Sequence, residues 1–274
     1  MKIEPVDDAA DPRIASYREA RDPELRARQG IFIAEGRTVV ARLLEGSRFR
    51  ARSVLVTPAA LEDLRAVLEG TEPGLSVHVA PAAVLRSVMG FNFHRGCLAM
   101  GERGPEPSPE PLIAPPGPRL LLVLEGLADP DNVGAVFRNA MAFGVHGVLL
   151  SPGCTDPLYR KAIRTSMGST LQIPWARLGE WPRGLARLRQ AGYTVWALTP
   201  RGAADLADFG TWRPVPERVA LLLGAEGKGL SDAARGEADL EVRIPMVPGA
   251  DSLNVATASG IALHRLRPAA PSAG

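Results

Sequence analysis

The sequence predicts an α/β protein with two domains, and three observations support this prediction. The chain has 274 residues, enough for two domains of ordinary size. Strand-like and helix-like segments alternate along both halves, as is typical of α/β folds. A proline-rich stretch, residues 104–118, lies between the halves. Such a composition favours an extended, semi-rigid spacer and excludes a helix or a central strand. We therefore expect domains at residues 1–103 and 119–267, with a disordered tail at residues 268–274.

The first half alternates between strands and helices after a polar segment at its start. A helix rich in arginine and glutamate is predicted at residues 13–28. The predicted strands that follow are residues 31–33, 53–56, 76–80 and 97–101, and the predicted helices are residues 38–44, 59–69 and 81–88. This order predicts a small α/β domain.

The second half predicts a mainly parallel sheet. Residues 120–124 form a continuous apolar run, which is expected of a strand buried on both faces. A helix from Asn132 to Gly144 and a strand at residues 147–150 complete a strand–helix–strand unit. The later predicted elements are a helix opening at Asp156-Pro157 and running to about Met167, a helix at 185–190, strands at 194–198, 219–223 and 241–246, and a closing helix at 252–266. Proline suits the first position of a helix, and Ser252 would cap the closing one.

Composition excludes several classes of protein. Two cysteines and four histidines are scattered without metal-binding spacing, so we expect neither a metal site nor a disulfide framework. The first eight residues are acidic and lack the apolar core of a signal peptide, and no apolar run reaches membrane-spanning length. We expect a cytoplasmic protein that does not contact a membrane. Aromatic residues are only 5% of the chain, so base stacking is not expected to dominate any nucleic-acid binding.

The basic residues are almost all arginine, and a net charge of +2 is too small to establish nucleic-acid binding. A biased genome composition and an RNA-related reason both explain this excess, although arginine suits phosphate recognition. Two local groups illustrate the choice between a phosphate-binding surface and a solvated surface. The first group is Arg37, Arg42, Arg48, Arg50 and Arg52, and the second is Arg160, Lys161 and Arg164 with Ser166 and Ser169.

Three short stretches, each following a predicted strand, carry the candidate chemistry. In residues 131–140, Arg138 lies off the apolar stripe of a helix among small residues, where a ligand or a second chain could approach. An ordinary surface arginine fits the same pattern, and Asn132 could be a plain N-cap. Residues 223–230 are glycine-rich but match neither phosphate-loop nor dinucleotide-binding spacing. The third stretch, residues 244–256, is a strand–loop–helix.

Taken in this order, the three stretches resemble the signature motifs of the SpoU (TrmH-like) RNA 2′-O-ribose methyltransferases of the SPOUT superfamily. The resemblance spans about residues 119–266. It implies S-adenosylmethionine as cofactor, RNA as substrate, a trefoil-knotted catalytic domain and a homodimer with a shared active site. The implied catalytic residues are Arg138, Asn132, Glu226, Ser252 and Asn254, and the implied cofactor-binding residues are Gly224, Ile244, Met246 and Leu253.

A second resemblance concerns the first half. Residues 30–37 are similar to the substrate-binding domain, with a ribosomal-protein-L30-like fold, that often precedes the SpoU domain. It implies RNA binding by the first half, with Arg37 as a candidate. Arg160, Lys161 and Arg164 of the second half are the other RNA-binding candidates, since sequences that resemble this half carry a basic pattern there as well. The two-domain organisation favours ribosomal RNA, with transfer RNA left open. A non-catalytic RNA-binding or ribosome-assembly protein on the same fold is the alternative.

The identity of the general base stays open. A guanidinium normally stays protonated in proteins, which argues against Arg138 as the base. Arg138 would instead bind phosphate and stabilise the developing alkoxide. Glu226 would then orient either Arg138 or Asn132.

Overall fold

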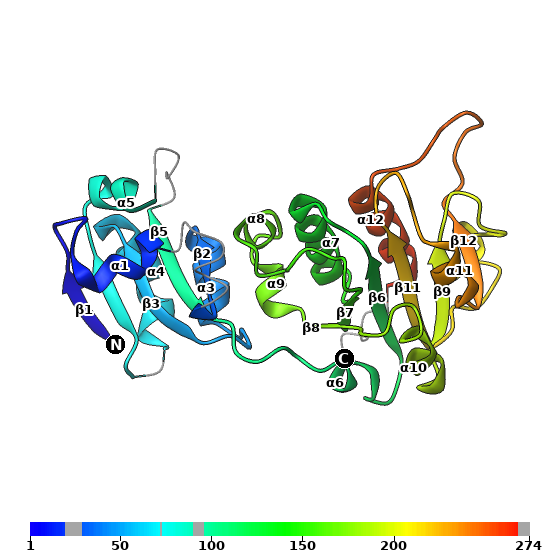
Figure 1. The fold of residues 1–274 in the computed structure, drawn as a ribbon, viewed down its shortest axis with the longest axis horizontal. Helices are drawn as coiled ribbons and strands as arrows, with labels where there is room; N and C mark the ends of the chain where they lie inside the picture. The colour runs from blue at the N-terminus through cyan, green and yellow to red at the C-terminus, as the bar shows by residue number, and fades with distance from the viewer. Residues whose placement is uncertain (20–28, 72, 90–95, 268–274) are drawn as a thin grey trace. The chain divides into compact units, whose positions relative to one another are not determined.

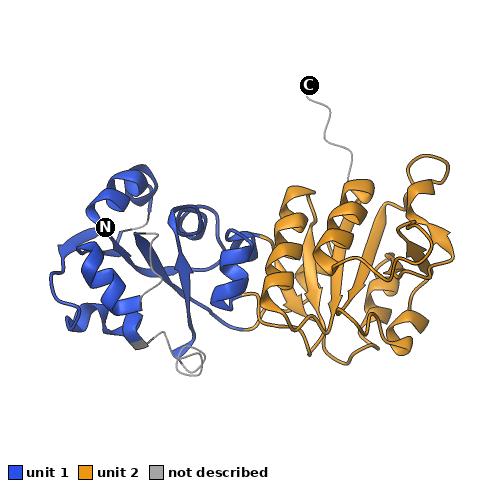
Figure 2. Cartoon of the chain, turned by 90° about the horizontal axis from the view of Figure 1, so that it is seen from above, with its two compact units in different colours: residues 1–105, 158–172 blue, residues 106–157, 173–274 orange. Residues whose placement is uncertain are grey.

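A computed structural model describes residues 1–19, 29–71, 73–89 and 96–267. It divides into two compact units (Figures 1 and 2). Unit 1 comprises residues 1–105 and 158–172, and unit 2 comprises residues 106–157 and 173–274. The tail predicted at residues 268–274 lies outside the described residues.

Unit 1 is a small α/β unit, as predicted, built on a five-stranded sheet in the order β1-β4-β3-β5-β2. Its strands are β1 (Lys2–Pro5), β2 (Ile31–Glu35), β3 (Ala51–Val56), β4 (Ser76–Val79) and β5 (Cys97–Glu102). Strands β1, β4 and β3 are parallel, whereas β5 is antiparallel to both β3 and β2. The helices are α1 (Ala15–Glu19), α3 (Arg37–Leu44), α4 (Pro58–Glu69) and α5 (Ala82–Met89), with α8 (Arg160–Thr165) and α9 (Ser169–Gln172) from later in the chain.

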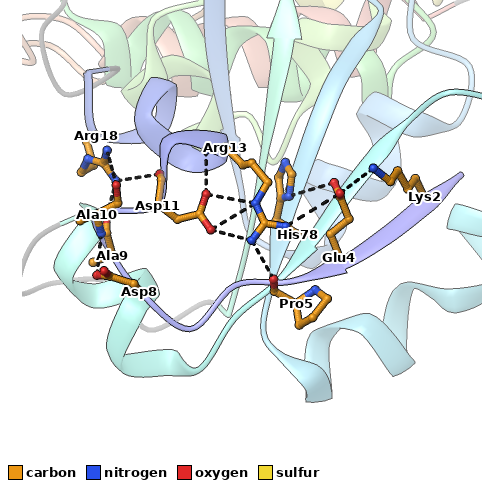
Figure 3. Close-up of polar contacts among 10 residues, drawn as sticks. All are labelled: Lys2, Glu4, Pro5, Asp8, Ala9, Ala10, Asp11, Arg13, Arg18 and His78. Carbon is orange, nitrogen blue, oxygen red and sulfur yellow. Dashed lines mark hydrogen bonds and ion pairs between the residues drawn. The ribbon is translucent and has the colours of Figure 1, made fainter.

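The start of unit 1 differs from the prediction of a polar segment. Residues 2–5 form the edge strand β1, because they pair in parallel with β4 along its whole length. A short helical turn, η1 (Pro12–Ile14), follows before α1. Arg13 fastens this turn: it donates to the carboxylate of Asp11 at 2.6 Å and to the carbonyl of Pro5 at 3.1 Å (Figure 3). The rest of the helix predicted at residues 13–28 lies outside the described residues.

Unit 2 contains a seven-stranded sheet in the order β10-β12-β9-β11-β6-β7-β8, in which every pair is parallel. Its strands are β6 (Arg119–Glu125), β7 (Gly147–Leu150), β8 (Trp175–Arg177), β9 (Thr194–Leu198), β10 (Ala204–Asp205), β11 (Arg218–Gly224) and β12 (Leu240–Arg243). Its helices are α6 (Glu110–Ile113), α7 (Pro130–Ala142), α10 (Leu185–Gln190), α11 (Asp232–Gly236) and α12 (Val255–Leu266), with the short turn η2 (Leu206–Asp208). The predicted parallel sheet is confirmed, and the apolar runs of β6 and β11 lie buried side by side at its centre.

The proline-rich stretch is not wholly extended, because it contains the four-residue helix α6. Proline fits there since the first turn of a helix has no partner for its N–H groups. Leu112 and Ile113 are buried and join the hydrophobic core of unit 2. The exclusion of helix from residues 104–118 was therefore wrong at this point.

Two further boundaries differ from the predictions. The helix predicted from Asp156 begins at Arg160 as α8, because Pro157 and Leu158 are buried in a turn. It ends at Thr165, two residues before Met167 adopts a left-handed backbone with φ of 53°.

The strand predicted to Met246 ends at Arg243. The neighbouring strands β9 and β10 end opposite Val242 and Arg243, so Ile244 has no strand partner.

Candidate active site

A cavity of about 630 Å³ lies at the carboxyl ends of β9, β11 and β12. The carboxyl edge of a parallel sheet is where open α/β folds bind ligands. Three segments far apart in the sequence form its wall: residues 198–201, 223–230 and 244–258. The predicted site residues that line it are Gly224, Glu226, Ile244, Met246, Ser252, Leu253 and Asn254.

Residues 224–230 of the second segment form a glycine-rich loop. It folds back over the end of its own strand, so that a Cβ on Gly224 would collide with the backbone of Gly229 and Leu230. The backbone N–H of Gly229 donates to the carbonyl of Ala225 at 2.8 Å, and Gly229 has a φ of 66° that disfavours a side chain. Glycine at 224 therefore permits the close backbone approach that shapes this wall.

Asn132 and Asn254 bring the first and third motifs together. The Asn254 side-chain amide donates to the Asn132 side-chain carbonyl at 3.0 Å. The side-chain carbonyl of Asn254 also accepts from the backbone N–H of Ala256 at 2.8 Å, which makes Asn254 the N-cap of α12. The prediction of Ser252 as this cap was wrong, because Asn caps a helix as well as Ser and the bond to Asn132 fixes its position.

The cap of α7 also differs from the sequence-based alternative for Asn132. Asp129 is the N-cap, and its carboxylate accepts from the backbone N–H of Asp131 at 2.9 Å. Asn132 lies inside the first turn of α7, so its side chain is available to Asn254.

Arg138 is exposed on α7 and is absent from the cavity wall. Within the described residues, its guanidinium forms no hydrogen bond or ion pair. Its neighbour Asn139 joins α7 to α12 by donating to the carbonyl of Ala256 at 2.7 Å and to the hydroxyl of Ser259 at 2.9 Å.

Glu226 is exposed in the glycine-rich loop. Among the described residues it makes no ion pair or hydrogen bond through its side chain to Arg138 or to Asn132. The orienting contact considered from the sequence is thus not formed in a single chain.

The cavity combines an apolar wall with a charged rim. Ile244, Met246 and Leu253 supply the apolar part, together with the ends of β9 and β11. The rim carries Arg201, Lys228, Arg235, Glu226 and Asp251. Sequence reasoning missed Arg201 and Arg235, although the rule that ligands bind at the ends of parallel strands could have indicated Arg201 after β9.

Arg235 is already engaged by protein groups. It donates to both carboxylate oxygens of Glu241, at 2.9 and 3.0 Å, and this hydrogen bonding raises the pKa of Arg235. Arg235 is therefore already paired with Glu241 in the absence of a ligand.

The predicted RNA-binding residues lie in unit 1 and fall into different environments. Arg37 lines a cavity of about 460 Å³ at the start of α3, together with Arg86 of α5. The Nε of Arg37 lies 2.8 Å from the carboxylate of Asp63. Lys161 and Arg164 are exposed on α8, whereas Arg160 contacts the buried Glu35 at 2.7 Å.

Two serines grouped with those basic residues are buried rather than exposed. Ser166 and Ser169 are 0% and 1% exposed and donate to the carbonyls of Ile163 and Ser166, at 2.9 and 2.8 Å. Neither alternative considered from the sequence, a phosphate-binding surface or a solvated surface, therefore fits these two serines. Arg42 of the other basic group is also engaged, donating to the carbonyl of Met167 at 2.7 Å.

Neither a membrane-spanning helix nor a metal cluster occurs among the described residues. None of their helices combines the length and apolar character needed to cross a bilayer. In the same part of the chain, His, Cys, Asp and Glu side chains form no group of three or more that could hold a metal ion.

Comparisons with known proteins converge on one family. Residues 119–264 match the model of the SpoU rRNA Methylase family. An uncharacterized tRNA/rRNA methyltransferase of Mycobacterium bovis is 42% identical over 268 residues, covering 96% of this chain and 91% of the relative. An AdoMet-bound rRNA methyltransferase from Sinorhizobium meliloti superposes with a TM-score of 0.79 at 27% identity, covering 97% of each chain. A solved RNA 2′-O ribose methyltransferase superposes with a TM-score of 0.77 at 29% identity, covering 96% of this chain and 98% of its own.

Proposed function

The chain belongs to the SpoU rRNA methylase family, and from this premise we propose that it transfers a methyl group from S-adenosylmethionine to a ribose 2′-hydroxyl of RNA. One observation carries the proposal. The second and third motifs line a single cavity, and the Asn132–Asn254 hydrogen bond ties the first motif to it. The solved relatives named for S-adenosylmethionine and for 2′-O ribose methylation support the cofactor and the position of methylation.

The cavity fits S-adenosylmethionine in size and in chemistry. Its volume of about 630 Å³ lies within the range of small-molecule pockets, roughly 300–1,000 Å³. Ile244, Met246 and Leu253 would hold the adenine ring by apolar contact. The backbone of the glycine-rich loop at residues 224–230, which we therefore term the cofactor loop, would hydrogen-bond the polar edges of the ring. When bound, the cofactor supplies an electrophilic methyl group.

The residues of the chain would position and activate the ribose. A guanidinium is a cationic hydrogen-bond donor, so we assign Arg138 to binding RNA phosphate and stabilising the developing alkoxide. Glu226, Ser252, Asn132 and Asn254 would arrange the hydroxyl and the cofactor at reacting distance.

A homodimer would complete this site. Arg138 does not line the cavity of its own chain, and the exposed Ile261 of α12 leaves apolar surface uncovered at 44% exposure. We propose that α7 and α12 pair with the same helices of a second copy and that Arg138 reaches a shared site. We also propose that unit 2 contains the trefoil knot of the family.

Unit 1 would bind the RNA substrate. The cavity of about 460 Å³ beside Arg37 and Arg86 presents cationic side chains at the N-terminal ends of α3 and α4, where backbone N–H groups favour anions. Lys161 and Arg164 would extend this contact, with Arg160 held between them and Glu35. We propose an L30-like fold for unit 1 and ribosomal RNA as the substrate.

Methyl transfer to fractionated RNA tests the proposal. Labelled S-adenosylmethionine is incubated with ribosomal and transfer RNA, using the wild type and Arg138→Ala. We expect label in ribosomal RNA, at linkages that resist alkali, with little label from the variant. Cofactor binding without label would indicate a different RNA substrate, such as an assembly intermediate. If the wild type showed neither labelled RNA nor cofactor binding, a non-catalytic RNA-binding protein would be favoured.

A further inference from the structure

We propose that Glu125 is a positioning residue that holds the cofactor loop in its binding shape, an inference that rests on the proposed function. Glu125 is the last residue of β6 and pairs with Gly224 in the strand ladder. Its carboxylate accepts from the backbone N–H of Ser231 at 2.8 Å and from the Ser231 hydroxyl at 2.7 Å. Ser231 is the first residue after the cofactor loop.

These contacts close the cofactor loop at its base. The loop leaves the sheet at Gly224, which lies opposite Glu125, and returns at Ser231, which the Glu125 side chain holds. The backbone bond from Gly229 to Ala225 narrows the loop between these ends. One residue therefore fixes both ends of the segment.

A third contact keeps the carboxylate of Glu125 in place. The indole N–H of Trp181 donates to it at 2.6 Å. Trp181 packs against the hydrophobic core of unit 2, which contains Leu230 of the loop and many residues outside it, so the indole ties the carboxylate to that core. Hydrogen bonds to an ionised acceptor are stronger than neutral ones, and Glu125 receives three.

The loop shape matters because all seven residues of the cofactor loop line the cavity. A loop that is free in the absence of ligand must be ordered when the ligand binds, which weakens affinity. Ser231 also caps α11, since its hydroxyl accepts from the backbone N–H of Ala234 at 3.1 Å. Glu125 thus steadies α11, which carries Arg235 to the rim.

Glu125→Gln tests the role with little change in size. The amide NH₂ of the glutamine cannot accept a hydrogen bond. The variant therefore loses either the bond from the Ser231 backbone N–H or the two bonds from the Ser231 hydroxyl and the Trp181 indole, depending on which position the NH₂ takes. By isothermal titration, we expect S-adenosylmethionine to bind about tenfold more weakly, the loss of one charge-assisted hydrogen bond. The matched control is Glu237→Gln, whose carboxylate pairs with Arg189 away from the loop and should leave affinity unchanged. Equal affinity of wild type and Glu125→Gln, or an equal loss in the control, would overturn the inference.

Kinetics separate positioning from a general structural role. A positioning role raises KM for S-adenosylmethionine and leaves kcat and RNA affinity near the wild-type values. A general structural role lowers kcat and RNA affinity as well, which would contradict the proposal. Ser231→Thr, which keeps the hydroxyl, should restore the affinity that Ser231→Ala loses.

Hydrogen exchange tests the loop without cofactor. In Glu125→Gln, amides of residues 224–231 should exchange faster, while those of residues 204–217 keep their rates. Unchanged exchange at residues 224–231 would refute the inference even if the protein methylates RNA. Faster exchange at residues 224–231 of Glu125→Gln, together with a wild type that binds no S-adenosylmethionine, would instead refute the proposed function alone.

Discussion

The helices α7 and α8 carry arginines in opposite electrostatic environments. On α7 in unit 2, Arg138 is exposed and has no hydrogen-bond or ion-pair partner among the described residues. On α8 in unit 1, Arg160 donates through Nε at 3.0 Å and Nη2 at 2.7 Å to one carboxylate oxygen of Glu35. Glu35 is only 5% exposed, and Arg160 is 33% exposed.

The contrast shows how a long-range partner decides what an arginine does. A carboxylate taken out of water needs a charged or hydrogen-bonding partner, so Glu35 commits Arg160 to a structural contact. Arg138 has no such commitment, and its charge is available to a ligand or to a second chain. We therefore expect substitutions of the two residues to affect different properties of the protein.

Arg138→Ala should give the largest effect. Methyl transfer should fall about 10²–10³-fold, as when one group that stabilises transition-state charge is removed. Because Arg138 is exposed and unpaired in the described chain, the free energy of unfolding should change by less than about 0.5 kcal/mol. Single-turnover methylation and denaturant unfolding measure the two quantities.

Arg138→Lys is the companion variant. It keeps the charge but loses the planar fork, so its rate should lie between those of wild type and Arg138→Ala. If Arg138→Ala lowered the free energy of unfolding by as much as Arg160→Ala does, Arg138 would also be a structural residue and the contrast with Arg160 would be lost.

Arg160→Ala should affect stability more than catalysis. It leaves the Glu35 carboxylate buried without its partner, at a cost of about 1–3 kcal/mol in the free energy of unfolding. The double variant Glu35→Gln with Arg160→Ala should recover part of this loss, because a neutral amide is less costly to bury. Denaturant unfolding measures all three proteins.

Arg164→Ala is the matched control on the same helix. Arg164 is exposed, so its loss should lower RNA affinity and leave the free energy of unfolding within about 0.5 kcal/mol. If Arg160→Ala behaved like Arg164→Ala, with weaker RNA binding and unchanged stability, the structural assignment of Arg160 would be wrong.

The sequence predicted the elements whose signal is local. The apolar runs at residues 120–124 and 219–223 identify β6 and β11, because a strand buried on both faces needs no alternation. Strands β1, β8 and β10 were missed because they are short and defined by pairing with strands distant in sequence. The helix α6 was missed because proline was taken to exclude helix altogether, whereas it is accepted in the first turn.

The same limit applies to the candidate site. Seven of the nine predicted catalytic and cofactor-binding residues line the cavity, because motif residues cluster at strand ends. The Glu35–Arg160 contact spans 125 positions and the Glu125–Ser231 contact spans 106, so no local spacing could indicate them. Asn254 and Ser252 are equally good caps by type, and only the bond to Asn132 distinguishes them.

The smallest expected effect concerns His78, which tests whether a buried titratable group of unit 1 makes stability depend on pH. It is 5% exposed, and its Nδ1 lies 3.8 Å from the carboxylate of Glu4, with Arg13, Asp11 and Lys2 nearby (Figure 3). Burial lowers the pKa of His78 below its usual value of 6.5, with Glu4 opposing the shift. Folded His78 therefore stays neutral at pH values where the unfolded chain is already protonated.

This difference makes stability depend on pH in a defined direction. Between the folded pKa of His78 and 6.5, the unfolded chain binds the additional proton, so stability rises with pH and falls on acidification. Lowering the pH from about 7.5 to about 5.5 should lower Tm in the wild type and lower it less in His78→Gln. The two proteins should differ by under about 1 kcal/mol in the accompanying loss of the free energy of unfolding.

Thermal unfolding of the two proteins across this range checks the prediction. His146, whose pKa burial also lowers, is present in both proteins, so only their difference reports His78. Asp11, with a pKa lowered to about 2 by its bonds to Arg13, stays ionised throughout and leaves the comparison undisturbed. Parallel Tm profiles would mean that His78 binds its proton equally in both states, and that the polar cluster of Figure 3 accommodates charge as readily as water does.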